Sequence, residues 1–162
     1  MQTILARIDM LNAIKNFFEK NISPEGNGDL EHELKLATAA LLIEMMYQDD
    51  QMHDKEIDAA KKSLTDKFEI TDDECHVLFE LAEAEVKEAV DYHQFTRLIA
   101  SEFTQAQKIK VVELLWSVAY ADSHLDSMEE HMVRKIADLI YVSHKDFMKT
   151  KHKVQSAMLT ND

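Results

Sequence analysis

Two acidic corners contain the residues whose types and spacing could support chemistry. In each corner an aspartate is followed seven positions later by a glutamate, as Asp49 by Glu56 and Asp122 by Glu129, and Asp126 lies inside the second corner. Carboxylate oxygens are the ligands that hard cations prefer, so these five side chains are candidate metal ligands. The expected cofactor is a divalent cation, with Ca²⁺, Mg²⁺ and Zn²⁺ as candidates.

Neither corner matches an EF-hand loop. Counted from Asp50 or from Asp122, the glycine at the sixth position and the glutamate at the twelfth are both missing. An aspartate before a helix also caps free backbone amides, and a glutamate in the first turn is favourable at the positive end of the helix dipole. Two interpretations therefore stay open: a cation or partner site, and a pair of helix starts that need acids for stability.

Two further glutamates stand on otherwise apolar segments. Glu44 and Glu113 could be buried with shifted pKa values, as a proton-transfer group would be. The alternative function is therefore a metal-dependent, hydrolase-like enzyme that uses Glu44 or Glu113 with a histidine. Each glutamate could equally mark a narrow solvent-facing edge of its helix. We find no catalytic motif in the sequence, and the first interpretation is a protein that is not an enzyme.

The segments that must position these residues are predicted to be helical. Apolar residues at three- and four-residue steps predict an amphipathic helix over residues 1–20, and the only proline and both glycines predict a flexible loop over 21–29. Thr71 and Thr104 each begin a capping box, which signals a helix start. We therefore expect an all-α protein, a helical bundle of about seven or eight helices whose main domain covers residues 30–158.

A shift of 73 positions superimposes the two corners and the helices around them. The pattern predicts a duplicated helical hairpin, residues 36–70 and 109–142, with the two halves packed face to face. Apolar positions meet apolar positions, and the acids coincide. The superimposed pairs include Leu41 and Leu114, Leu42 and Leu115, Tyr47 and Tyr120, Asp49 and Asp122, Met52 and Leu125, and Glu56 and Glu129.

Charge and composition exclude several classes of function. The net charge of −13 argues against a nucleic-acid-binding protein, and two glycines cannot build a phosphate-binding loop. The single cysteine, Cys75, excludes an internal disulfide and a cysteine-based zinc site. The apolar run over 111–121 is too short to span a membrane, and charged residues interrupt any signal peptide at the start. The expected location is the cytoplasm.

Two charged segments are each interpreted as a solvated helix face, with a docking surface as the alternative. One is acidic and contains Glu80, Glu83, Glu85 and Glu88. The other is basic, suits an acidic partner or a membrane, and contains Lys145, Lys149, Lys151 and Lys153.

The stretch LLWSVAYADSHLDSMEEHMVRKIADLI resembles the TerB-like family, the tellurite-resistance group of small bacterial proteins that also includes the central domain of the membrane co-chaperone DjlA. The family pattern is an apolar helix, then Ala-Asp-Gly, a glutamate, and Arg-x-Ile-Ala-Asp-Leu-Leu. It is met by Ala121, Asp122, Glu129, Arg134, Ile136, Ala137, Asp138 and Leu139. The first copy keeps Asp49 and Glu56, and the resemblance covers roughly 36–154. Ser123 and Asp50 replace the glycine, which departs from a tight turn with positive φ.

The resemblance implies an all-helical domain of paired hairpins, in the cytoplasm and sometimes coupled to the inner membrane. It implies a non-enzymatic binding or scaffold module of stress or metal response, with acidic sites for divalent cations. The implied partner is a protein, which can belong to a membrane-associated complex. The His-Pro-Asp motif of a J domain is absent, because the only proline is Pro24.

A last interpretation is a purely structural bundle that forms a homodimer through a methionine-rich face. The candidate residues are Met45, Met46, Met128 and Met132.

Overall fold

The all-α prediction is confirmed. The structure is a computed structural model that describes residues 12–22, 29–48, 54–87, 93–120 and 127–160, and these ranges contain helices and short connections but no strand. Residues 12–17 are helical and continue into a π-helical turn. The elements are η1 (Phe18–Ile22), α2 (Leu30–Gln48), α3 (Asp54–Phe68), α4 (Asp72–Lys87), α5 (Gln94–Glu102), α6 (Gln105–Ala119), α7 (Ser127–Leu139) and α8 (His144–Thr160).

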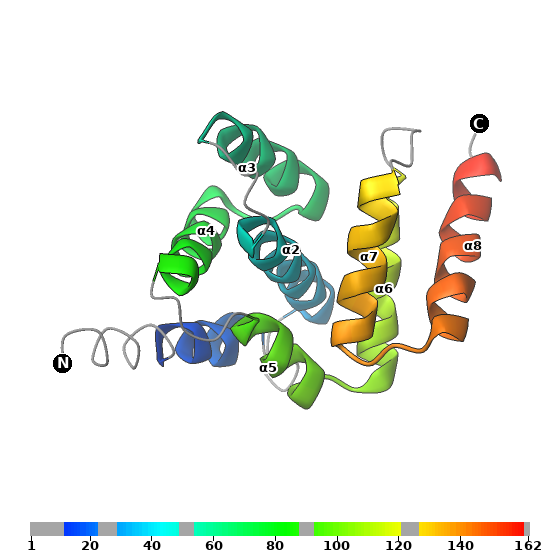
Figure 1. The fold of residues 1–162 in the computed structure, drawn as a ribbon, viewed down its shortest axis with the longest axis horizontal. Coiled ribbons are helices and arrows are strands. Elements are labelled where there is room, and N and C mark those ends of the chain that lie inside the picture. Colours follow the sequence, from blue (N-terminus) through cyan, green and yellow to red (C-terminus); the bar gives the residue numbers. More distant parts are fainter. Residues whose placement is uncertain (1–11, 23–28, 49–53, 88–92, 121–126, 161–162) are drawn as a thin grey trace.

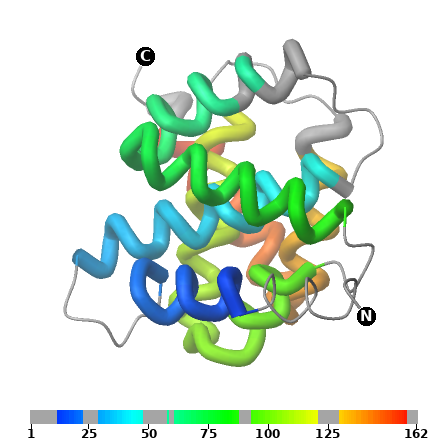
Figure 2. The backbone as a smooth tube through the Cα atoms, turned by 90° about the vertical axis from the view of Figure 1, so that its left-hand side faces the viewer, coloured from blue at the N-terminus to red at the C-terminus, as the bar shows by residue number. Residues whose placement is uncertain are grey.

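Helix α2 forms the centre of the bundle. It contacts η1, α3, α4, α5, α6 and α7, and Figure 1 shows it between α3, α4 and α5 on one side and α6, α7 and α8 on the other. The run from Leu36 to Leu41 is buried throughout, including the polar Thr38. A helix that is apolar on most sides must be covered on most sides, which explains this position. In Figure 2, α4 runs beside α2, and the N-terminal helical segment crosses below it.

The second half of the chain packs around α6. Trp116 is fully buried, and its ring centroid lies 5.0 Å from that of Phe147 on α8 and 5.8 Å from that of Tyr120. Helices α7 and α8 both contact α6, and α6 in turn contacts α2. The interface between α2 and α6 is therefore where the two halves meet. No described helix is long and apolar enough to cross a membrane.

The duplicated hairpin has a structural counterpart. Helix α3 begins at Asp54 and α7 begins at Ser127, which are 73 positions apart. Each follows a long helix, α2 or α6, and these two helices pack against each other. The connections between the helices of each hairpin, residues 49–53 and 121–126, lie outside the described residues.

The candidate methionine face largely belongs to the core. Met45 is buried, and Met46 and Met132 are half-buried against the same cluster of apolar side chains. The side chain of Met128 lies outside the described residues. The described methionines therefore serve packing within the chain.

Three helix ends or starts use a left-handed backbone without a glycine. Glu69, His93 and Tyr141 have φ angles of 54°, 80° and 64°. At Tyr141, which follows α7, the N–H groups of Tyr141 and Val142 donate to the carbonyls of Asp138 and Ala137 at 3.2 and 2.8 Å. This is a Schellman ending, in which glycine normally takes the position of Tyr141.

We expect Tyr141→Gly to raise the free energy of unfolding by about 1 kcal/mol, because glycine reaches a positive φ without the steric cost of a Cβ. The midpoint of urea denaturation measures the change. Tyr141 is 74% exposed, so little buried area is lost. The control is Tyr141→Ala, which removes the ring beside Lys108 but keeps the Cβ, and should give no gain. An equal gain in both variants would contradict the backbone explanation.

Candidate functional site

The acidic corners fall largely outside the described part of the chain. Asp49, Asp122 and Asp126 lie in the connections that the structure does not describe. Glu56 and Glu129 are each the third residue of a helix, α3 and α7, but their side chains are also outside the described residues. Both glutamates thus lie in a first turn, the position at which an acid favours the helix dipole. Among the described side chains, no group of three or more His, Cys, Asp or Glu residues could hold a metal.

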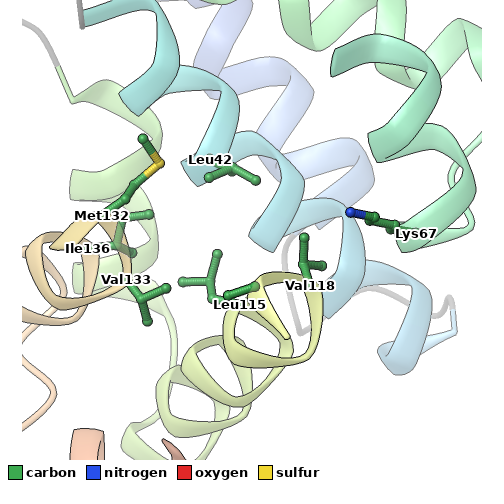
Figure 3. A pocket seen from close by; sticks show the side chains of 8 residues that line it. Leu42, Lys67, Leu115, Val118, Met132, Val133 and Ile136 are labelled. Atoms are coloured by element: carbon green, nitrogen blue, oxygen red, sulfur yellow. The ribbon is translucent and has the colours of Figure 1, made fainter. Parts of the chain in front are cut away.

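An apolar pocket lies between the two hairpins, close to the ends of α2 and α6 (Figure 3). Its volume is about 150 Å³, and Leu42 and Leu115, which the repeat superimposes, face it from α2 and α6. Lys67 of α3 reaches its edge. Val118, Ala119, Met132, Val133 and Ile136 complete the lining. The described side chains of the two halves therefore leave an apolar recess where the helices lead into the corners.

Glu44 is buried on α2. Of the two alternatives predicted for it, a buried glutamate or a solvent-facing edge, the first is therefore correct. Its carboxylate accepts hydrogen bonds from the backbone N–H of Phe95 at 2.9 Å, the N–H of Thr96 at 3.2 Å and the Thr96 hydroxyl at 2.7 Å. Only 1% of the residue is exposed. Glu44 therefore caps the N-terminus of α5 from another helix, because the N-cap residue itself, His93, offers no side-chain hydrogen bond.

Glu85 joins Glu44 at the same helix end. It is also 1% exposed, and its Oε1 accepts the N–H of His93 at 2.9 Å. Burial raises the pKa of Glu85 to about 9, and the neighbouring charge of Glu44 acts in the same direction. Two carboxyl groups from α4 and α2 thus meet at the start of α5.

The interpretation of Glu85 as part of a solvated face is wrong. Glu80 and Glu83 are exposed, but Glu85 lies on the same side of α4 as Leu78 and Ala82, both buried. The spacing of four and then three residues is the signal that could have identified it. The identity of the side chain obscured the signal, because glutamate is rarely buried.

Glu113 forms ion pairs at an edge of α6. Its carboxylate lies 2.6 Å from Nζ of Lys153 on α8 and 3.6 Å from that of Lys110, and its side chain is 14% exposed. Among the described residues, neither Glu44 nor Glu113 has a hydrogen bond or ion pair with an imidazole. Glu113 thus lies at a solvent-facing edge of its helix, and no described histidine pairs with either glutamate.

The basic end of the chain is partly neutralised within the fold. Lys151 lies 2.6 Å from Glu130 and over the Trp116 ring, and Lys153 is paired as described above. Lys145 and Lys149 are exposed on α8. Glu130, which neighbours the second corner in sequence, is therefore directed toward α8.

A carboxylate and an imidazole do converge elsewhere. Nε2 of His32 on α2 lies 2.9 Å from Oε2 of Glu74 on α4. Glu74 also accepts the N–H of Thr71, and the Thr71 hydroxyl accepts the N–H of Glu74, which confirms this capping box. The second predicted box, between Thr104 and Gln107, is also present. Burial opposes ionisation of Glu74, but hydrogen bonds from Thr71 and His32 outweigh it and lower its pKa.

A comparison with protein-family models matches residues 35–152 to the tellurite resistance protein TerB. The chain belongs to the TerB family. The match covers most of the chain and includes both hairpins, α4 and α5 and most of α8, so the family resemblance seen in the second corner extends to the first half. Comparisons with curated proteins and with solved structures find no match.

We expect Glu74→Gln to lower the free energy of unfolding at pH 7 by roughly 0.5–1 kcal/mol, because glutamine keeps the capping box but loses the charge. The pKa of Glu74 is lower in the folded chain than its ordinary value of 4.5. Its contribution is therefore present above pH 4.5 and disappears as the pH falls through the folded pKa. Urea denaturation of both proteins from neutral to acidic pH measures the difference.

The matched control is Glu80→Gln. Glu80 lies 2.9 Å from His76 on the same helix, but both side chains are well exposed, so its loss should change stability little. An equal loss in both variants, or a Glu74→Gln effect that stays constant into acid, would contradict the role of the half-buried charge.

Proposed function

We propose that this TerB-family chain is a non-enzymatic binding module that holds a divalent cation at its acidic corners. The ligands would be Asp49 and Glu56 in the first corner and Asp122, Asp126 and Glu129 in the second. Oxygen ligands of this kind suit Ca²⁺ and Mg²⁺ best, with Zn²⁺ as a further candidate. The single observation that carries the proposal is the matched acid spacing after two equivalent helices that pack against each other.

The proposed mechanism links the corners to the packing of the two halves. Each corner joins the two helices of one hairpin, so a cation bound there would fix the angle between those helices. The apolar pocket between α2, α6 and α7 lies beside the same helix ends and leaves space for a change in packing. Cation binding would in this way alter the surface that a protein partner meets, in a stress or metal response.

The partner is proposed to be a protein, which can belong to a membrane-associated complex. The exposed Lys145 and Lys149 on α8 support a basic contact surface for an acidic partner on an otherwise acidic chain.

A divalent cation should raise the melting temperature of EDTA-treated protein, because a ligand that binds only the folded state stabilises it by mass action. The test adds Ca²⁺, Mg²⁺, Mn²⁺ and Zn²⁺ separately, and compares the wild type with Asp49→Asn, Asp122→Asn and the double variant. At a cation concentration about 100 times the dissociation constant, the expected gain is roughly 2.7 kcal/mol. The double variant should show no gain, and each single variant a reduced one.

The matched control is Asp73→Asn, which removes an exposed first-turn aspartate from α4 and should keep the full cation response. Calorimetric titration then gives the stoichiometry, with two cations per chain for separate corners and one for a shared site. If no cation shifts the melting temperature, or if the double variant responds like the wild type, the acids serve only as helix starts and the cation proposal fails.

A further inference from the structure

Two ionised carboxylates at the start of α5 would carry more negative charge than their surroundings compensate. Glu44 and Glu85 are both almost fully buried, and neither forms an ion pair with lysine or arginine within the described ranges. A helix N-terminus carries only about half a positive charge. Two buried negative charges in contact would therefore remain largely uncompensated, and such a pair normally retains one proton.

The hydrogen bonds show which carboxyl group keeps the proton. Both oxygens of Glu44 accept from α5, with three donors at 2.7–3.2 Å, so the ionised form suits Glu44. In Glu85 only Oε1 has a donor among the described residues, while Oε2 is buried and accepts from none. The proton that the pair retains needs a carboxyl oxygen that accepts no other hydrogen bond. That proton belongs on Oε2 of Glu85.

We propose that Glu44 and Glu85 form a buried proton-binding site, in which protonated Glu85 donates to ionised Glu44 and the pair together docks α5 on α2 and α4. The site is distinct from the acidic corners and does not depend on them. It makes the attachment of α5 sensitive to pH.

The described titratable groups at the start of α5 come from three elements. Glu44 comes from α2, Glu85 from α4 and the His93 imidazole from the start of α5, where Nδ1 is buried without a hydrogen-bond partner among the described residues. The next charged side chain along α5, Arg97, lies on its exposed face. The test is placed above the pH range in which imidazoles normally titrate.

The sign of the pH effect follows from linkage. The pKa of Glu85 is raised from 4.5 to about 9 in the folded chain, because burial and the charge of Glu44 both oppose ionisation. Between these values the folded chain binds one proton more than the unfolded chain, so the stability that this pair contributes is fully present below pH 4.5 and is lost as the pH rises toward 9. One proton corresponds to about a tenfold rise in the unfolding constant per pH unit.

Glu85→Gln is the decisive variant, because the glutamine amide can donate to Glu44 and accept from His93 without a titrating proton. Urea denaturation between about pH 7.5 and 8.5 measures the unfolding constant. In the wild type this constant should rise about tenfold per pH unit, and in Glu85→Gln this rise should be missing. The control is Glu33→Gln, which removes a buried glutamate on α2 whose pKa is raised by burial and by the charge of the exposed Asp29, not by a second buried carboxyl group. It should keep the wild-type slope.

Glu44→Gln tests the assignment of the charge. It leaves the α5 amides without an anionic acceptor, so the unfolding constant at pH 7 should rise by roughly ten- to a hundredfold. Glu85→Gln should change it far less at the same pH. Equal losses in the two variants, or a larger loss in Glu85→Gln, would overturn the assignment of the proton to Glu85.

Infrared spectroscopy of the folded proteins in D₂O gives a readout that a purely structural role would not move. The wild type at pH 7 should show the carbonyl stretch of a protonated carboxyl group. This band should be absent from the spectrum of Glu85→Gln, and in the wild type it should weaken as the pH passes about 9. Glu33→Gln should retain the band. The proposal fails if the wild-type band is absent at pH 7, or if it persists unchanged in folded Glu85→Gln.

Discussion

The first half of the fold depends on how the N-terminus of α5 is satisfied. The helix begins at a left-handed His93 that provides no side-chain cap, so its free amides turn to the buried carboxyl groups of Glu44 and Glu85. This arrangement joins α2, α4 and α5 at one point. Helix α5 leads directly into α6 through the Thr104 cap, so the same junction sets where the second half begins its path. A polar interaction thereby fixes a position that apolar packing alone would leave free to shift.

The junction also distinguishes the two halves of a repeated sequence. At the shift of 73 positions, Ser117 on α6 is the repeat equivalent of Glu44 on α2. The Ser117 hydroxyl donates to the backbone carbonyl of Glu113 on its own helix. Helix α6 therefore has no equivalent capping carboxylate, and α8 rather than a short cross-helix covers it. The hairpins share a plan, but among the described residues only the first contributes a carboxyl group to this buried pair, whose other member, Glu85, comes from α4. The two corners can thus be alike in their acids while their surroundings respond differently to pH.

A scarcity of glycine shapes the connections. With two glycines in the sequence, the left-handed positions after or before helices fall to Glu69, His93 and Tyr141. Each takes a conformation that costs a residue with a Cβ some free energy. At His93 the hydrogen bonds at the α5 junction hold the strained backbone, and at Tyr141 the Schellman bonds do so. Strain of this kind persists only where the surrounding contacts determine the backbone.

The sequence by itself determined the helices, both confirmed capping boxes, the matched helix starts and the family, because periodicity, caps and motif are local signals within a few turns of chain. It also identified Glu44 as a glutamate out of place on an apolar helix. Tertiary structure alone decided that Glu85 is its partner and that Glu113 pairs with lysines, since burial of a charged residue depends on which helices meet over it. Fifty-one positions separate Glu44 from Phe95, and nothing local to either residue specifies their contact.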